Sequence, residues 1–320
     1  MNRVQRARLA FRVAFFALFL LAPPLDLFRF DLTRGHFWVF GIPWTLGIDA
    51  DQPLLTALNL MVRGFLPVAL VVGTGAWVSW RYGRLYCGWL CPHFSVVETI
   101  NALMRRASGK PTLWERAALP ERQSDGRTIR PHRAVWWLVA LGVVFFALLW
   151  AVTLLTYLLP PAEVWGNLLA GHPTRNQALF IGIATLLLTL EFSLARHLFC
   201  RFGCAVGLFQ SLVWMGNRRA LVVGFDRTRA DACARCDASC EHACPMRLKP
   251  RQIKRKIFTC TQCQQCVQAC ERVTRAQGLP SLLQMLADDC APDASQRDFG
   301  RRPSVPDDCF DRRGVSGEQR

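Results

Sequence analysis

The sequence predicts an all-α polytopic membrane protein with four transmembrane helices, followed by a small α+β domain on its cytoplasmic side. Three observations lead to this fold class. Long uncharged apolar runs alternate with basic loops. The pattern aromatic–Cys–x3–Cys occurs twice, once in each half of the chain, which indicates an internal repeat. Eight further cysteines are concentrated in residues 233–270, after the last apolar run.

Composition supports a membrane protein over a nucleic-acid-binding protein. The chain has 320 residues, 52% of them hydrophobic, and a net charge of +16. In a soluble protein this excess of Lys and Arg would suggest a nucleic-acid partner. Here it accompanies long uncharged runs, so basic cytoplasmic segments beside a lipid bilayer are the better interpretation. The spacings of the 14 cysteines fit metal sites better than a secreted disulfide scaffold.

Four transmembrane spans are expected near residues 11–28, 54–80, 134–160 and 178–195, within a membrane domain at 1–220. The third span has no charged residue and is long enough to cross a hydrocarbon core of about 30 Å. The first is interrupted by prolines, and a cleaved signal peptide is the alternative there. The short apolar stretch 38–48 is interpreted as an interfacial or re-entrant segment.

The distribution of Lys and Arg predicts the orientation. Residues 1–12 hold four, 29–52 two, 81–133 ten and 161–176 one, and the chain is basic again after 196. Because basic loops stay on the cytoplasmic side, both termini are expected in the cytoplasm of a bacterial cell, with the chain multi-pass in the inner membrane.

Each repeat ends with a cysteine pair at the expected inner surface. Cys87 and Cys91 follow the second span, and Cys200 and Cys204 follow the fourth. Because residues four apart share a helix face, packing of the two spans would bring four thiols into one pocket. Such a redox or catalytic pocket could hold copper, zinc or a further iron–sulfur cluster, or carry out dithiol–disulfide chemistry. The alternative is that these cysteines pack as small apolar residues.

An amphipathic stretch follows each cysteine pair, at 94–104 and 208–215. We expect each to be a helix on the inner leaflet or a continuation of the preceding span. His93 and His197 flank the pairs. They are candidates for additional ligands, although surface histidines are the commoner case.

The second cysteine run reads Cys260-x2-Cys263-x2-Cys266-x3-Cys270, the spacing with which bacterial ferredoxins bind a 4Fe–4S cluster. In two-cluster ferredoxins the last cysteine of each motif ligates the other cluster. The sequence therefore predicts two 4Fe–4S clusters in a domain at 221–285. One would be bound by Cys233, Cys236, Cys240 and Cys270, and the other by Cys260, Cys263, Cys266 and Cys244.

Three further features accompany these motifs. The first motif is one residue longer between its second and third cysteines, and two tetrahedral zinc sites are the alternative to clusters. The linker 245–259 is basic; it would raise a cluster's potential or attract an acidic partner, or it is an ordinary inside-positive segment. The tail 286–320 is expected to be disordered, and no role is predicted for its Cys290 and Cys309.

Several segments together resemble a known group of proteins. They are FDLTRGHFWVFGI, GRLYCGWLCP, HLFCRFGCAVGLFQS, VGFDRTR and GLPSLLQ, spread over about residues 15–285. The chain resembles the membrane-bound polyferredoxins of the NapH/MauN, NosR and CcoG (FixG or RdxA) type, and is most similar to CcoG. It departs from CcoG in having Ala205 where that family has Pro, and in showing no counterpart of its C-terminal helix and immunoglobulin-like domain.

The resemblance implies iron–sulfur electron transfer. For CcoG it implies reduction of Cu(II) to Cu(I) during assembly of cbb-type cytochrome oxidase. For the other branches it implies electron supply to, or maturation of, a periplasmic redox enzyme. We expect electrons to enter from a cytoplasmic donor or quinol, pass through both clusters, and leave through the CxxxC pocket to a metal ion or partner protein. The alternative is a non-enzymatic metal-binding assembly factor.

Overall fold

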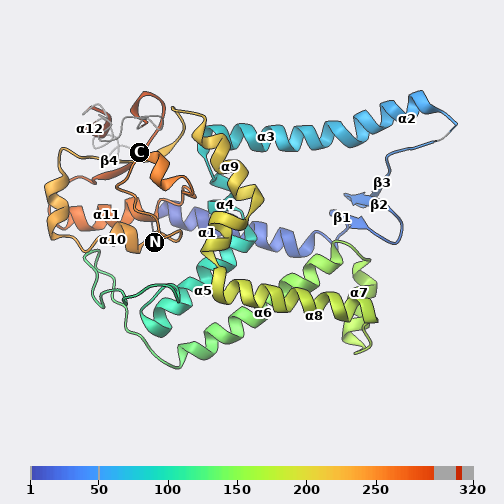
Figure 1. Cartoon of the computed structure of the whole chain (residues 1–320), viewed down its shortest axis with the longest axis horizontal. Helices are drawn as coiled ribbons and strands as arrows, with labels where there is room; N and C mark the ends of the chain where they lie inside the picture. Colours follow the sequence, from blue (N-terminus) through green and yellow to red (C-terminus); the bar gives the residue numbers. More distant parts are fainter. Residues whose placement is uncertain (1, 50, 292–307, 312–320) are drawn as a thin grey trace. The chain divides into compact units, whose positions relative to one another are not determined.

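The computed structural model describes residues 2–49, 51–291 and 308–311, and it is mostly helical (Figure 1). The chain divides into two compact units. The first comprises Met1–Leu9, Ala76–Trp137 and His197–Arg320, and the second Ala10–Gly75 and Leu138–Arg196. All twelve cysteines that the sequence singles out for metal or redox roles belong to the first unit.

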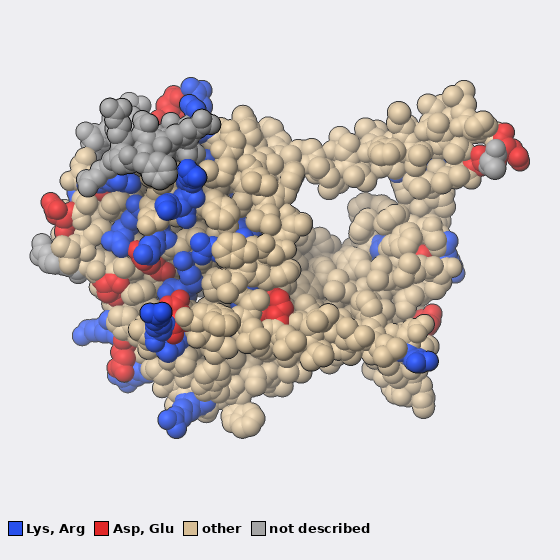
Figure 2. Space-filling view, in the orientation of Figure 1, with Lys and Arg blue, Asp and Glu red and all other residues tan. Residues whose placement is uncertain are grey.

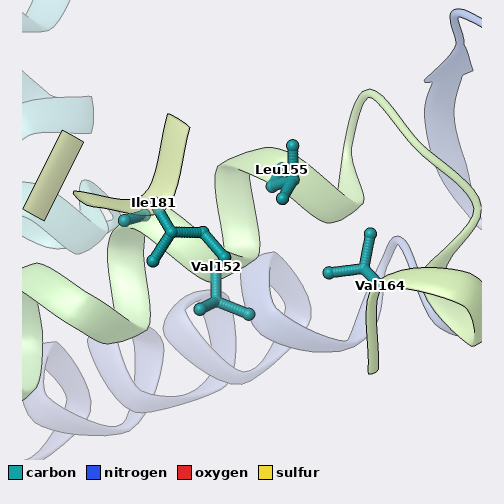
Figure 3. Packing of buried hydrophobic residues seen from close by; sticks show 5 residues of the cluster. Val152, Leu155, Val164 and Ile181 are labelled. Carbon is teal, nitrogen blue, oxygen red and sulfur yellow. The ribbon is translucent and has the colours of Figure 1, made fainter. Parts of the chain in front are cut away.

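The second unit has a helical core. The helices that concern this core are α1 (Arg3–Leu21, from residue 10 onward), α6 (Val135–Thr156, from residue 138 onward), α7 (Pro161–Leu169) and α8 (Arg175–Leu190). Val152, Leu155, Val164 and Ile181 are buried together where α6, α7 and α8 meet (Figure 3). A capping box formed by Thr174 fixes the start of α8.

Helix α1 packs on α6 through aromatic residues. The rings of Phe19 and Trp150 lie edge to face with centroids 4.1 Å apart. The hydroxyl of Tyr157 donates to the carbonyl of Phe19 at 2.9 Å. These contacts hold the start of the chain against the most apolar helix of the unit.

A small antiparallel sheet corrects the expectation of an all-α membrane domain. Strands β1 (Phe28–Asp31), β2 (His36–Val39) and β3 (Ile42–Trp44) pair in the order β1-β2-β3. The segment expected to be interfacial or re-entrant therefore forms two strands. The turns between strands use Gly35 and Gly41, whose φ angles of 68° and 75° suit glycine.

Three helical segments are long and apolar enough to cross a membrane, by length and composition. They are Pro53–Tyr82, Val135–Thr156 and Arg175–Ala195. The first comprises α2 (Pro53–Asn59), the π-helical η1 (Leu60–Phe65) and α3 (Leu66–Tyr82); the last adds the π-helical η2 (Glu191–Ala195) to α8. They correspond to three of the four expected spans.

The span expected at 11–28 remains a prediction. Its residues begin in α1, which carries Arg6, Arg8 and Arg12 and ends at Leu21, before two prolines. The remainder forms a turn and the start of β1, so the helix ends before the expected span does.

The first unit contains most of the shorter elements. They are α4 (Leu85–Trp89), α5 (Pro92–Ser108), η3 (Phe199–Gly203), α9 (Ala205–Met215), β4 (Val222–Phe225), η4 (Ala230–Arg235), α10 (Ser239–His242), η5 (Lys254–Ile257), α11 (Gln265–Arg275), β5 (Leu283–Leu286), η6 (Asp288–Cys290) and α12 (Asp308–Asp311). Strands β4 and β5 pair antiparallel, from Val222 opposite Leu286 to Phe225 opposite Leu283. Strand β4 precedes the cysteine-rich segment in the chain and β5 follows it. The helices and the two paired strands together agree with the expected α+β domain.

The two amphipathic helices differ in what they contact. Phe94, Val97, Ile100 and Met104 of α5 are buried inside the unit, so this helix is a core element and not a leaflet helix. On α9, in contrast, Leu212 is 73% exposed. Only the second repeat keeps the apolar exposed face that the sequence predicts for both.

The C-terminal tail is partly described. The expected disordered segment begins at 286, which is still within β5, and its residues 292–307 and 312–320 lie outside the described residues. Cys290 and Cys309 form a disulfide. Disulfides are rare in cytoplasmic proteins, so this bond is unusual for the location that the sequence predicts for the tail.

Candidate metal centres

Two cavities in the first unit are each lined by four cysteines. Cys233, Cys236, Cys240 and Cys270 line one of them. Cys244, Cys260, Cys263 and Cys266 line the other. These are the two groups into which ferredoxin spacing divides the eight cysteines. Cys270, the last cysteine of the second motif, lines the first cavity, and Cys244, the last cysteine of the first motif, lines the second.

The loops that carry the thiols turn through left-handed backbone. Gln262 and Gln264, on either side of Cys263, have φ angles of 53° and 60°. Non-glycine residues adopt this conformation rarely, and successive turns of this kind point backbone N–H groups into a concavity that suits anions and iron–sulfur clusters. In the longer first motif Ala238 has φ 61°, and Cys240 lies in the short helix α10 that follows. The additional residue thus falls in the segment that contains this left-handed turn.

Amide groups and burial define the environment of the second set. The Leu248 amide donates to Cys244 Sγ at 3.4 Å. Burial raises the pKa of Cys244 to about 11. Burial also raises the pKa of Cys266, and the neighbouring thiols, including Cys240 of the first set, add to the effect. Binding of iron by these thiols must therefore release protons.

The donor set fits a 4Fe–4S cluster. Each cavity offers four thiols, and no Asp or Glu is among the described residues that line either one. A cubane separates its four thiolates more widely than one zinc ion does, because each thiolate binds a different iron.

The paired CxxxC cysteines occupy equivalent places in the two repeats. Cys87 lies in α4 and Cys200 in η3, whereas Cys91 and Cys204 are the N-cap residues of α5 and α9. The expectation that each pair shares one helix face is wrong, because the chain leaves the helix between the two cysteines. In the first repeat Pro92 favours this break, since it disfavours helical backbone at the preceding residue.

Three of these four thiols interact electrostatically, and the fourth contacts a histidine. Burial raises the pKa of Cys91 to about 12, with smaller contributions from Cys87 and Cys204. Cys200 Sγ lies 3.6 Å from His93 Nδ1. His197 is buried, although a surface position was expected for it as the commoner case for histidine.

The first CxxxC segment packs directly on the loop of the second cysteine set. Gly88 lies so close to Thr261 that a Cβ built on it would be 1.9 Å from the Thr261 carbonyl oxygen. Beside it, Trp89 Nε1 donates to the carbonyl of Gln262 at 3.2 Å. Gly88 separates two cysteines of the pair, and Thr261 follows Cys260. One backbone contact therefore joins the two kinds of site.

Arg84 connects the same parts through its guanidinium. Its Nη2 donates to the carbonyl of Cys200 at 2.7 Å and lies 3.7 Å from Cys87 Sγ. Its Nη1 reaches the carbonyl of Thr259 at 3.5 Å. The sequence analysis assigned no role to Arg84. Its position three residues before Cys87, within the segment GRLYCGWLCP, is the signal that could have indicated one.

The N-terminal helix also supports the site. Arg8 is 2% exposed; its Nε donates to the carbonyl of Gly88 at 2.7 Å, and its Nη2 pairs with Glu98 at 2.6 Å. Gln5 Nε2 donates to the carbonyl of Cys263 at 2.8 Å. In the sequence analysis Arg8 contributed only to the predicted orientation of the chain. No local pattern distinguishes this buried arginine from the exposed Arg6.

These features define a thiol-rich protein with two sites suited to iron–sulfur clusters and with helices long enough to span a membrane. The family described as "4Fe-4S binding domain" (Fer4_5) matches residues 64–111 and 176–221. The two matches fall on equivalent parts of the two repeats and contain the CxxxC pairs, not the eight cysteines of 233–270.

One curated relative is named "Putative electron transport protein YccM", from Escherichia coli (strain K12). It is 28% identical over 242 residues, which cover 70% of this chain and 61% of the relative. The chain thus spans less than two thirds of that relative's length. No solved structure matches the chain. Together the matches support a membrane protein of the ferredoxin type that transfers electrons through iron–sulfur centres; they do not single out the CcoG type.

Proposed function

We propose that this protein is an inner-membrane electron carrier with two 4Fe–4S clusters, one on Cys233, Cys236, Cys240 and Cys270 and the other on Cys244, Cys260, Cys263 and Cys266. The observation that carries the proposal is the division of the eight cysteines between two cavities with one cysteine exchanged each way. Cross-ligation of this kind is the pattern of two-cluster ferredoxins, and two independent zinc fingers have no need of it.

Exposure supports an order of electron flow. In the first set Cys233, Cys236 and Cys270 are partly exposed and only Cys240 is buried, whereas in the second set Cys260 is partly exposed and the other three cysteines are buried. Electrons enter at the first cluster, move to the second, and continue to the CxxxC thiols across the contact between Thr261 and Gly88. Both termini and both clusters lie on the cytoplasmic side in this proposal, as the distribution of Lys and Arg favours.

The exit of the electrons is the CxxxC group, formed by Cys87, Cys91, Cys200 and Cys204. Thiolates are soft ligands that bind iron or Cu(I), so the acceptor is a metal ion, such as Cu(II) in oxidase assembly, or a redox-enzyme partner. A passive metal-binding assembly factor is the competing function. Loss of electron transfer on replacing one of these cysteines, with clusters and protein level intact, favours the carrier, and retention favours the assembly factor.

The first test is anaerobic purification of the whole chain in detergent, with iron, acid-labile sulfide, copper and zinc counted. Two clusters correspond to about eight iron and about eight sulfide per chain. Electron paramagnetic resonance after dithionite should show reduced cubanes. Zinc with little sulfide would refute the proposal.

A second test addresses ligand exchange between the motifs. The electron paramagnetic resonance spectrum of the variant Cys270→Ala should equal that of Cys236→Ala, because both variants lose the first cluster and keep the second. Cys244→Ala should match Cys263→Ala, because both remove the second. If Cys270→Ala instead matches Cys263→Ala, each motif binds its own cluster and the assignment is wrong.

A further inference from the structure

We propose that a basic pocket beside the first cluster cavity is the docking site of a small acidic one-electron carrier protein, which supplies the electrons. This inference rests on the proposed function and identifies the class of donor. The pocket is an open depression lined by Arg227, Arg251 and Lys256 together with Phe225. Among the described residues that line it there is no Asp or Glu.

The pocket shares a wall with the first cluster cavity. Phe225 and Arg251 line both. Arg251 also donates to Glu241 at 2.6 Å, so its charge is partly offset, while Arg227 and Lys256 line only the basic pocket. A partner seated here would therefore contact two residues that also line the first cluster cavity.

The charge of the surface selects the partner. Figure 2 shows Lys and Arg side chains gathered, with some Asp and Glu among them, over the part of the chain that holds α10, α11 and β4, whereas the residues of α2 and α3 are mostly uncharged. A positive surface steers an acidic protein towards it and accelerates encounter. An anionic lipid surface would also be attracted to these Lys and Arg residues. A planar bilayer, however, would not fill a pocket that lies beside the cluster cavity.

The chemistry limits the donor to a one-electron carrier. A 4Fe–4S cluster accepts a single electron, passing from the 2+ to the 1+ state while the carrier is oxidised by one electron, and no bond forms or breaks. A nicotinamide donor gives two electrons as hydride and needs a flavin to divide them. A small acidic ferredoxin or flavodoxin meets both requirements.

The test measures electron transfer into the full chain, purified anaerobically into nanodiscs of neutral phosphatidylcholine. The probe is a reduced plant-type 2Fe–2S ferredoxin, and cluster reduction is followed by stopped-flow absorbance. The variant Arg227→Gln/Lys256→Gln should lower the second-order rate constant about tenfold at low salt, and the difference should disappear at high salt. Arg116→Gln/Arg122→Gln, which removes two exposed charges of the same unit, should leave the rate unchanged.

Iron content and the dithionite-reduced spectrum are recorded before the carrier is added. Absence of reducible clusters at that stage would refute the proposed function itself. With clusters present, equal rates for the pocket variant and wild type would overturn the docking site. So would direct reduction by NADH, or a pocket variant that loses only its binding to phosphatidylglycerol vesicles, which would assign the surface to the membrane.

Discussion

Replacing Gly88 with alanine tests whether the CxxxC segment and the second cluster loop are one structure. Gly88 is buried in α4, and the added Cβ would lie 1.9 Å from the carbonyl oxygen of Thr261 and 3.1 Å from its Cβ. Real Cβ contacts shorter than 3.0 Å are essentially absent from proteins. The obstacle is backbone, so no side-chain rotation can relieve it.

The required displacement sets the size of the effect. Thr261 must move by about 1 Å, and it lies between Cys260 and Cys263 in the loop that lines the second cavity. Sites of this kind tolerate displacements of only about 0.5 Å before binding suffers. We therefore expect Gly88→Ala to lose the second cluster, so that iron falls from about eight to about four per chain, and to lose about 1–3 kcal/mol of stability.

The assay is the iron and sulfide count with electron paramagnetic resonance of the reduced protein. The remaining spectrum should equal that of Cys263→Ala. Gly216→Ala is the matched control, because its added Cβ would make an ordinary contact of 3.4 Å to Val213. Full iron content and an unchanged spectrum in Gly88→Ala would refute the coupling between the two segments.

Three further predictions concern buried cations. Arg8→Met should lower the free energy of unfolding by about 3 kcal/mol, since Glu98 loses its partner, with part recovered in Arg8→Met/Glu98→Leu. Lys254→Met should lower it by about 1–3 kcal/mol, because two backbone carbonyls that accept from Nζ at 3.0 and 2.7 Å lose their donor. Arg84→Gln should make the midpoint potential of the second cluster more negative, since it removes a positive charge that acts on Cys260.

Each of these variants has a matched control. Chemical denaturation in detergent measures the first two, against Arg6→Met and Lys256→Met, which change exposed charges nearby. A redox titration followed by electron paramagnetic resonance measures the third, against the exposed Arg106→Gln. Equal unfolding curves for a buried-site variant and its control, or equal potentials for both arginine variants, would contradict the corresponding role.

Local patterns explain how much the sequence could predict. The apolar runs identified three segments that the structure forms as long helices, because composition over about 20 residues determines whether a helix can cross a membrane. Cysteine spacing likewise divided eight thiols into two sets without knowledge of the fold. Both kinds of signal are contained in short stretches of chain.

The errors arose where local alternatives compete. Residues 38–48 are apolar enough to suggest an interfacial or re-entrant segment, but Gly35 and Gly41 permit tight turns, and strands within residues 28–44 pair with one another as a sheet. The CxxxC spacing alone suggested one helix face, yet each second cysteine begins a new helix. For α5 and α9 the same amphipathic pattern gave opposite outcomes, because burial depends on what packs against the apolar face.

The contacts that connect the sites could not be predicted, because each joins residues far apart in sequence. Arg84 reaches Cys200, 116 residues away, and Arg8 reaches Gly88, 80 residues away. Both arginines looked like ordinary inside-positive charges.

The two repeats are equivalent in sequence but not in their contacts with the second cysteine set. The first repeat meets it through backbone packing at Gly88 and the hydrogen bond from Trp89. The second repeat is joined to the same region by Arg84, which donates to the Cys200 carbonyl. The proposed electron path uses this difference. In that proposal Cys87 and Cys91 lie next to the second cysteine set, and Cys200 and Cys204, beside the exposed apolar face of α9, are the pair available to the acceptor.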